Sequence, residues 1–248
     1  MPVTRPGSLA LALTLALGCR AAITEPATPP DVDLVPNQAT TLHPALARTV
    51  ERLLPELDTI PAERREALDA LAEFVVEAKA AGRPAKLIFI CTHNSRRSHI
   101  SQLWAATAAA WFGLRDIETF SGGTEVTAFN PRAVASMKRA GFVIDEPGGD
   151  NPHYQVSLSP AGPALTAFSK TWDDPVNPRD AFAAVMTCSQ ADESCPFVRG
   201  ASSRISLPYD DPKLADGTAE EAQVYDQRSR QIAAEMLYVF GVVSQKVE

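Results

Sequence analysis

The stretch 85–98, AKLIFICTHNSRRS, constrains the fold of this chain more than any other. Lys86–Ile90 is a short apolar run typical of a buried strand, and apolar residues recur at helical spacing after Ser98. Cys91 and Arg97 therefore lie in a loop between a strand and a helix, in a Cys-x5-Arg-Ser pattern. Backbone N–H groups of such a loop point inward and form a cage for a tetrahedral oxyanion. The stretch predicts an α/β domain with an anion-binding loop.

The residue types in this loop suit nucleophilic chemistry. Backbone N–H groups and a guanidinium favour a thiolate, and such surroundings lower a cysteine pKa from about 8.5 to roughly 3.5–7.5. We therefore expect Cys91 to be a nucleophile at neutral pH. Arg97 can hold two oxygens of an anion through its planar fork, and Ser98 can donate a hydrogen bond to the sulfur. The alternative, a buried structural cysteine with a surface arginine, explains neither the strand nor the helix.

This loop resembles that of the low-molecular-weight protein tyrosine phosphatase superfamily, which includes the thioredoxin-coupled arsenate reductases. The usual family sequence is Cys-Thr-Gly-Asn-Ser-Cys-Arg-Ser, so this chain departs at His93 and at Arg96. His93 places a side chain where the backbone often needs the freedom of glycine. The resemblance covers roughly Lys86 to Phe240. It implies that an oxyanion contacts the whole loop after the cysteine: Thr92, His93, Asn94, Ser95, Arg96, Arg97 and Ser98.

A second chemical signal follows the predicted buried strand Phe182–Cys188. The segment 187–196, TCSQADESCP, is similar to the one that holds the redox pair of thioredoxin-coupled arsenate reductases. On an intact helix Cys188 and Cys195 would have Cα atoms roughly 10 Å apart, whereas a disulfide needs about 4.4–6.8 Å. Forming this disulfide must therefore unwind any helix between the two cysteines.

The resemblance implies a relay of three cysteines. Cys91 attacks arsenate, Cys188 attacks Cys91 and expels arsenite, and Cys195 attacks Cys188. The alternative for Cys188 and Cys195 is an ordinary structural disulfide, which an exported protein favours. The chain lacks a CxxC pattern and paired histidines, so neither a metal site nor a cofactor is predicted.

An Asp-Pro pair follows the predicted fourth strand, Ser203–Leu207. The family places a catalytic carboxylate directly before a proline on this loop, so the resemblance implies that Asp211 is the general acid. Asp210 is the alternative. Lys213 and Leu214 follow where phosphotyrosine-specific members tend to have aromatic residues, which favours small oxyanions as substrates.

The first residues are typical of a targeting signal. Arg5 is the only charge before the apolar run Leu9–Leu17, which is too short to span a bilayer. Leu17-Gly18-Cys19 resembles a bacterial lipobox, which implies lipidation of Cys19 and an exported, membrane-anchored or periplasmic protein. The alternative is an ordinary signal peptide. The net charge of −7 makes the chain a poor partner for nucleic acid, and the anchor is the only membrane contact expected.

Four regions follow from this reading: a leader over 1–19, a Pro-rich linker over 20–40, a helical hairpin over 41–83 and a catalytic domain over 84–248. The predicted fold class is α/β, a three-layer sandwich with four parallel strands and helices on both faces. The hairpin rests on two apolar stripes at helical spacing: Leu46, Val50, Leu53 and Leu54 in one, and Leu68, Leu71, Val75 and Ala78 in the other. It is a stabilising cap or, alternatively, a surface for a partner.

Other predictions concern the second half of the chain. The Pro-rich region 146–180 is either a cover over the active site or a plain surface insertion. Asn130-Pro131 begins a helix that Gly141 ends, and Thr218–Glu221 is a capping box for a final helix ending near Gly241. His99 and His153 are expected on the surface or with satisfied hydrogen bonds.

Three functions are compatible with these patterns. The favoured one is reduction of arsenate to arsenite, with a small oxyanion as substrate and a thioredoxin-like reductant as partner. The second is a low-molecular-weight phosphatase that hydrolyses phosphotyrosine or small aryl and acyl phosphates through a phosphocysteine. It needs Cys91, Arg97 and Asp211 but neither later cysteine. The third is an oxyanion-binding module without turnover.

Overall fold

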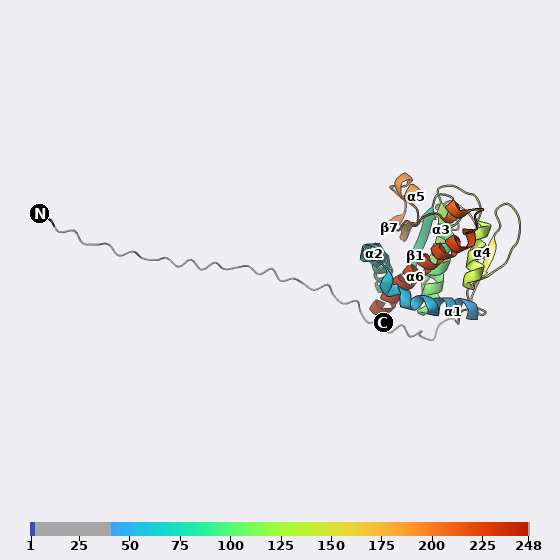
Figure 1. Ribbon diagram of the computed structural model, residues 1–248, viewed down its shortest axis with the longest axis horizontal. Helices are drawn as coiled ribbons and strands as arrows, with labels where there is room; N and C mark the ends of the chain where they lie inside the picture. Colours follow the sequence, from blue (N-terminus) through green and yellow to red (C-terminus); the bar gives the residue numbers. More distant parts are fainter. Residues whose placement is uncertain (3–40, 248) are drawn as a thin grey trace. The chain divides into compact units, whose positions relative to one another are not determined.

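The computed structural model describes residues 1–2 and 41–247 (Figure 1). Most of the predicted leader, Cys19 and the linker over 20–40 lie outside the described residues. None of the helices in the described ranges is long and apolar enough to cross a membrane.

A sheet of four parallel strands forms the centre of the catalytic region. Its order is β2 (Ile117–Gly123), β1 (Ala85–Cys91), β6 (Phe182–Met186) and β7 (Ala201–Ser206). The strands β1, β6 and β7 begin within two residues of the predicted runs. Because all four strands are parallel, their carboxyl ends meet at one edge of the sheet, and ligands of such sheets bind there. Cys91 is the last residue of β1, at that edge.

Side chains of β1 alternate between two buried clusters, one on each face of the sheet. Leu87 and Phe89 belong to the larger cluster, whereas Ile88 and Ile90 belong to the smaller one. A strand buried on both faces reads as a continuous apolar run, which is the pattern of Lys86–Ile90. The sequence prediction of a three-layer α/β sandwich is confirmed.

The helices of the catalytic region cover the two faces unequally. On the larger cluster, α3 (Arg97–Trp111) and α6 (Glu221–Val247) pack side by side, and α4 (Pro131–Ala140) contacts α6. The other face is covered by the short α5 (Ser189–Ser194) and by loop segments. The predicted start of α4 is correct, since Asn130 accepts a hydrogen bond from the Arg132 N–H.

The final helix differs from its prediction at both ends. It begins at Glu221, whose carboxylate accepts from the Gly217 N–H at 2.6 Å. The Thr218 hydroxyl donates instead to the Ala215 carbonyl, at the end of the 3-10 helix η2 (Pro212–Ala215). The predicted capping box is therefore wrong. Gly241 lies inside the helix and does not end it.

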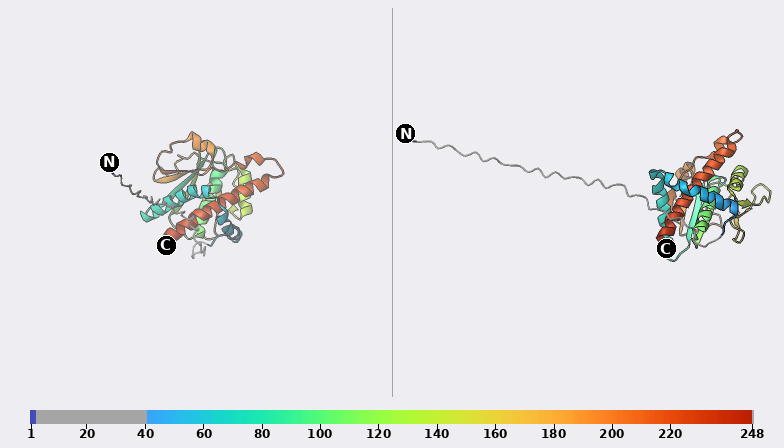
Figure 2. Two further views of the ribbon diagram at one scale, coloured as in Figure 1. Left: turned by 60° about the vertical axis from the view of Figure 1, so that its left-hand side comes forward. Right: turned by 60° about the horizontal axis from the view of Figure 1, so that its bottom comes forward.

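Residues 44–80 form α1 (Pro44–Leu53), the 3-10 helix η1 (Leu54–Thr59) and α2 (Ala62–Ala80). The two α-helices use their apolar stripes to pack against the rest of the fold: α2 lies along α6, and α1 contacts α6 and α4 (Figure 2). The α2 stripe also reaches β1 and β7. These helices therefore extend the larger cluster.

The region after α4 forms a second sheet. Three short antiparallel strands compose it: β3 (Val143–Ile144), β4 (Tyr154–Ser157) and β5 (Leu165–Ala167). From there the chain runs along the end of β2, where Gly123 donates its N–H to the Lys170 carbonyl and accepts from the Trp172 N–H. A Cβ atom at Gly122 would lie 2.4 Å from Trp172 Cα, so only glycine allows this approach.

Candidate active site

Cys91 and its loop lie at the junction of β1 and α3. The sulfur is buried, and the Cys91 residue is only 3 % exposed. The loop needs a left-handed backbone at one position, but this position is Asn94, with a φ of 42°, and not His93 as predicted. Asparagine tolerates this conformation better than most residues. The departure from glycine at His93 therefore does not strain the loop.

Asn94 and Ser98 orient a hydrogen bond toward the Cys91 sulfur. The backbone N–H of Lys170 donates to Asn94 Oδ1 at 2.9 Å, so the Asn94 amide must present its Nδ2 to Ser98 Oγ, also at 2.9 Å. The Ser98 oxygen thus accepts from Asn94, and its own hydrogen is free for Cys91 Sγ, 3.1 Å away. This hydrogen bond stabilises a thiolate.

Arg97 begins α3 and is held at the site by the loop that follows β7. Its NH1 group donates to the Tyr209 carbonyl at 3.0 Å, and its NH2 group donates to Asp211 Oδ2 at 2.8 Å. Its buried Nε has no hydrogen-bond partner in the described part of the chain. An anion that engages the guanidinium would satisfy this donor.

The two adjacent aspartates point in different directions. Asp211 faces Arg97 with one carboxylate oxygen and accepts from the Lys213 N–H with the other. Asp210 has a side chain that is 88 % exposed and pairs with Arg228. The structure thus brings Asp211, and not Asp210, to the predicted oxyanion loop.

Cys188 lies beside the loop, at the end of the neighbouring strand. Its sulfur is 3.5 Å from Thr92 Oγ1, and it caps α5 by accepting from the Ala191 N–H at 3.4 Å. Cys91 and Cys188 belong to the same buried cluster, against which Cys195 packs. All three cysteines are free in this structure.

A complete short helix separates Cys188 from Cys195, since α5 occupies Ser189–Ser194. Arg204 of β7 holds this helix through two hydrogen bonds. It donates to the Asp192 carbonyl at 2.6 Å and to the Cys195 carbonyl at 3.1 Å. Cys195 is partly exposed at the helix end, whereas Cys188 is buried at its start. The sequence did not indicate Arg204, because nothing local distinguishes it from a surface arginine on an edge strand.

The Arg96 side chain turns away from the anion-binding loop. Its Nε donates to the Tyr225 hydroxyl at 2.8 Å, and its NH2 group pairs with Asp216 at 3.3 Å. Burial raises the pKa of Tyr225 to about 12, so the phenol remains a donor to Asp216. Only the backbone of Arg96 is left for an oxyanion. The arginine that replaces a family cysteine instead joins the loop to α6 and to the Asp211 loop.

Two other loop side chains also face away from an anion. The Ser95 hydroxyl donates to the Ala128 carbonyl at 2.7 Å, and the His93 ring lies 3.5 Å from the Glu125 carboxylate at the surface. Main-chain contacts hold the same region, since the Thr92 carbonyl accepts from the Glu125 N–H. The anion-binding capacity of 92–96 therefore resides mainly in backbone groups.

The 146–180 region packs against the loop. Ser169 Oγ donates to the His93 carbonyl, and Lys170 is the residue that orients Asn94. Lys170 is only 4 % exposed, and burial lowers its pKa to about 8. These contacts distinguish the region from a plain surface insertion. The sequence could not indicate them, because they depend on how the second sheet returns the chain to β2.

His99 is buried behind the loop, which excludes the surface alternative. Its ring stacks on Phe129, and its Nε2 lies 3.2 Å from the Phe168 carbonyl. Burial is the main reason that its pKa is lowered to about 3, so the ring is neutral. His153 is exposed and stacks on the Phe168 ring.

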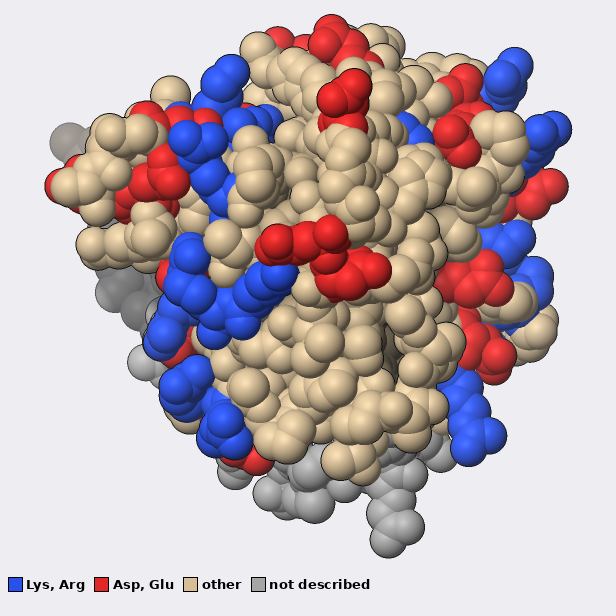
Figure 3. All heavy atoms as spheres, turned by 90° about the vertical axis from the view of Figure 1, so that its right-hand side faces the viewer, with Lys and Arg blue, Asp and Glu red and all other residues tan. Residues whose placement is uncertain are grey.

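The chain as a whole is acidic, with a net charge of −7. The described residues contain no group of three or more His, Cys, Asp or Glu side chains that could hold a metal ion. On the face shown in Figure 3, basic side chains lie beside acidic ones around a broad uncharged area. Attraction of an anion therefore depends on the loop N–H groups and Arg97 rather than on the overall field.

A Cys-x5-Arg loop after the first strand of a parallel sheet, with an aspartate directed at its arginine, defines a class of protein. This geometry agrees with the resemblance of the loop to that of the low-molecular-weight protein tyrosine phosphatase superfamily. In sequence, the chain is similar to curated arsenate reductases. The one from Bacillus licheniformis is 28 % identical over 155 residues, which are 62 % of this chain and 94 % of the relative.

A second curated relative has a similar identity. The arsenate reductase of Bacillus subtilis is 29 % identical over 144 residues, 58 % of this chain and 86 % of the relative. Among solved structures, a thioredoxin-dependent arsenate reductase from Corynebacterium glutamicum is 22 % identical and covers 76 % of this chain and 77 % of its own, with a TM-score of 0.35. No protein-family model matches the chain.

Proposed function

We propose that this protein reduces arsenate to arsenite with Cys91, Cys188 and Cys195 as its three redox thiols. The observation that carries the proposal is the placement of Cys188, whose sulfur lies 3.5 Å from the Oγ1 of Thr92, the residue next to Cys91. A phosphatase needs no second cysteine at this position. The similarity to curated arsenate reductases supports the same reading.

In the first step the Cys91 thiolate attacks the arsenic of bound arsenate. An S–As bond forms, and one oxygen leaves as water after it receives a proton from Asp211. Arg97 and the backbone N–H groups of the loop hold the remaining oxygens. Asp211 is well placed for this role because it is already 2.8 Å from the arginine that would hold the anion.

In the second step Cys188 attacks the Cys91 sulfur. A Cys91–Cys188 disulfide forms, the electron pair of the S–As bond stays on arsenic, and arsenic leaves as arsenite. Cys195 then attacks Cys188, which releases the Cys91 thiolate and leaves a Cys188–Cys195 disulfide. This last step must open α5, because its two cysteines lie at opposite ends of the helix.

The oxidised pair needs two electrons to return to the dithiol. We propose a dithiol protein of the thioredoxin kind as the donor, which would reach the disulfide at the partly exposed Cys195 end of α5. Export of the protein and lipidation of Cys19 remain predictions from the sequence.

A thiol count tests the proposal. The chain carrying Cys19→Ala, fully reduced, is exposed briefly to arsenate without air, and its free thiols are titrated. The relay predicts the loss of two of the three thiols, with peptide mapping that finds a Cys188–Cys195 bridge. Phosphate is the matched control, since it has the same shape and charge but accepts no electrons. The same bridge must fail to form in Cys91→Ser.

Survival of all three thiols in arsenate would exclude the reductase. The alternative is then a phosphomonoesterase, which the contact between Asp211 and Arg97 also allows. It predicts that p-nitrophenyl phosphate is hydrolysed by the wild type and by Cys188→Ser alike, but not by Cys91→Ser.

A further inference from the structure

Two adjacent arginines of the anion-binding loop reach opposite ends of one short helix. The 3-10 helix η2 has Asp211 as its N-cap and Asp216 as its C-cap. Arg97 pairs with Asp211 at 2.8 Å, and Arg96 pairs with Asp216 at 3.3 Å. Each arginine therefore holds one end of the segment that carries the proposed general acid.

The contact at Asp216 is a triangle of three side chains that are shielded from solvent. Arg96 Nε donates to the Tyr225 hydroxyl at 2.8 Å, and that hydroxyl donates to Asp216 Oδ1 at 2.7 Å. Tyr225 is fully buried, and the side chains of Arg96 and Asp216 are only 12 % and 23 % exposed. Because charge-assisted hydrogen bonds are stronger away from water, this triangle fixes the end of η2.

Other contacts of η2 are weaker. The helix contacts α6 and buries two of its four residues, a proline and an alanine, whereas Leu214 is 90 % exposed. Arg132 lies 3.7 Å from the Asp216 carboxylate but makes its close ion pair, at 2.6 Å, with Glu221. Arg96 is therefore the main ionic partner of the C-terminal end of η2.

During the proposed reaction, the contact between Asp211 and Arg97 cannot hold η2 alone. Arg97 has to bind the oxygens of arsenate, and Asp211 has to carry a proton toward the oxygen that leaves. Tyr209 fixes the chain two residues before Asp211, through the hydrogen bond of its hydroxyl to Glu235. An anchor after Asp211 must not depend on the anion. The Arg96 side chain meets this condition, because it turns away from the anion-binding loop.

We propose that Arg96 is a positioning residue for the general acid. By holding Asp216, it keeps η2, and hence Asp211, in reach of the departing oxygen while Arg97 binds the anion. A general acid must lie within hydrogen-bond reach of its acceptor, so a small displacement slows the reaction. This inference rests on the proposed function, since it concerns the acid of the first step.

A double-mutant cycle of Arg96→Met and Asp211→Asn tests whether Arg96 acts through the acid. The chain carrying Cys19→Ala, fully reduced, reacts with arsenate in a single turnover without air. Thiol loss gives the rate at saturation and the half-saturating arsenate concentration. We expect Arg96→Met to lower the rate about tenfold, less than the loss of the acid itself. The half-saturating concentration should stay within about twofold, because Arg97 and the backbone N–H groups remain.

The double variant decides between positioning and a general structural effect. In the Asp211→Asn background, Arg96→Met should change the rate by no more than about twofold, since the acid on which it acts is already absent. Losses that multiply in the double variant would overturn the proposal. A higher half-saturating concentration at an unchanged rate would also overturn it, because Arg96 would then shape the anion-binding loop instead.

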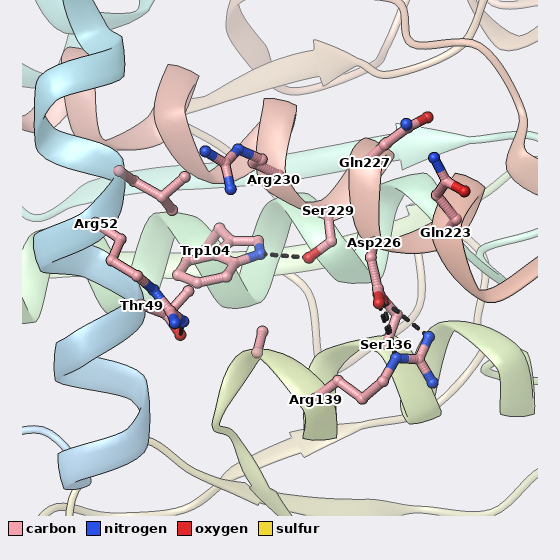
Figure 4. A pocket seen from close by; sticks show the side chains of 12 residues that line it. Thr49, Arg52, Trp104, Ser136, Arg139, Gln223, Asp226, Gln227, Ser229 and Arg230 are labelled. Carbon is pink, nitrogen blue, oxygen red and sulfur yellow. Dashed lines mark hydrogen bonds and ion pairs between the residues drawn. The ribbon is translucent and has the colours of Figure 1, made fainter.

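Arg139→Met is the matched control for removing an arginine that pairs with a carboxylate. Arg139 of α4 pairs with Asp226 of α6 at 2.8 Å, in the wall of a cavity away from the Cys91 loop (Figure 4). It also donates to the Ala222 carbonyl, so it ties α4 to α6 and leaves η2 as it is. Its rate should equal that of the wild type within about twofold.

Hydrogen exchange at η2 gives a readout that needs no reaction. The Lys213 N–H donates to Asp211 Oδ1, and the Asp216 N–H donates to the Lys213 carbonyl. We expect these amides to exchange about tenfold faster in Arg96→Met than in the wild type or in Arg139→Met. Unchanged exchange would overturn the proposal.

The two measurements separate this inference from the proposed function. If the wild type keeps all its thiols in arsenate, the reductase fails, and hydrogen exchange still decides whether Arg96 holds η2. If Arg96→Met fails to fold, Asp216→Ala cuts the same contact from the other side and replaces it in both measurements.

Discussion

The hydroxyl of Ser98 donates to the sulfur of Cys91 across 3.1 Å, and its direction is fixed by the groups behind it. The backbone N–H of Lys170 can only donate, so the Asn94 amide must turn its oxygen to Lys170 and its nitrogen to Ser98. The Ser98 oxygen then accepts from Asn94, which leaves the hydroxyl hydrogen to point at Cys91. Through the backbone N–H of Lys170, the 146–180 region therefore helps to direct the hydrogen bond that the Cys91 sulfur receives. A thiolate gains from this hydrogen bond more than a thiol does.

Ser98→Ala tests this relationship through the reactivity of Cys91. In a background with Cys19, Cys188 and Cys195 replaced, we expect alkylation of Cys91 by iodoacetamide at pH 6 to slow about tenfold, the value of one charge-assisted hydrogen bond. The difference should narrow at pH 9, where the thiolate forms without help. Ser101→Ala is the control, because Ser101 lies on the same helix and donates to the Arg97 carbonyl. Equal slowing at both pH values would contradict the proposed role.

Adjacent aspartates offer a matched test of the general acid. Asp211→Asn removes the proposed proton donor beside Arg97, whereas Asp210→Asn changes a neighbour that is 88 % exposed and paired with Arg228. We expect Asp211→Asn to slow arsenite formation, with a dithiol as reductant, by about 10²-fold or more, as general acids commonly contribute. Asp210→Asn should remain within about twofold of the wild type. Similar losses in both variants would assign the effect to the loop rather than to the acid.

Helices and strands could be predicted from the sequence where a single property, such as an unbroken apolar run, decided the local structure. The strand at Lys86–Ile90 is apolar on both faces, so its burial between two clusters was predictable. The capping box at Thr218 failed because the η2 turn offers the Thr218 hydroxyl a nearer acceptor, the Ala215 carbonyl. Local hydrogen bonds of this kind compete with helix caps, and sequence spacing does not show which one wins.

The site followed from the sequence less completely than the fold. The motif predicted that Cys91 and Arg97 share a loop, the family resemblance added Asp211, and the structure brings all three to one edge of the sheet. The direction of the Arg96 side chain depends on Tyr225, which is 129 positions later in the chain, so no local pattern could reveal it. The sequence did not indicate the roles of Lys170 and Arg204 either, because their partners also lie on other segments of the chain.

Arg204 should control how readily Cys188 and Cys195 join. Its hydrogen bonds to the Asp192 and Cys195 carbonyls hold α5 closed, and the disulfide requires α5 to open. We expect Arg204→Met to speed oxidation of the pair by diamide about 10²-fold, since two charge-assisted hydrogen bonds and the ion pair with the Asp192 carboxylate are lost. Arg199→Met, which removes an exposed arginine five residues after the end of this helix, is the control. An unchanged rate in Arg204→Met would mean that α5 opens without releasing this arginine.

His99 makes stability depend on pH. Its pKa is about 3 in the folded protein, below its ordinary value of 6.5, because the ring is buried. Between these values only the unfolded chain binds the proton, so the free energy of unfolding falls as the pH drops from 6.5 towards 3. In His99→Gln this slope should decrease by about 1.4 kcal/mol per pH unit, measured by urea unfolding between pH 6 and 4. His153→Gln, on the surface, should leave the slope unchanged.

A buried network joins the N-terminal helices to Arg97. Arg64 of α2 makes two hydrogen bonds to Glu235, at 3.0 and 2.9 Å, and Glu235 accepts from the Tyr209 hydroxyl at 2.7 Å. The Tyr209 carbonyl in turn accepts from Arg97. Burial and the Glu235 carboxylate raise the pKa of Tyr209 well above 10, so its phenol remains a donor.

Glu235→Gln should therefore destabilise the protein more than most single changes. It leaves Arg64, whose side chain is only 18 % exposed, without its counter-charge, and breaking a buried pair costs about 3–5 kcal/mol. Urea unfolding measures the loss, and Glu73→Gln on the exposed side of α2 is the control. Replacing both partners, by Arg64→Met and Glu235→Leu, should cost less than Glu235→Gln alone, because no unpaired charge remains. If the double variant is the less stable of the two, the pair contributes more than charge neutralisation, through its hold on Tyr209.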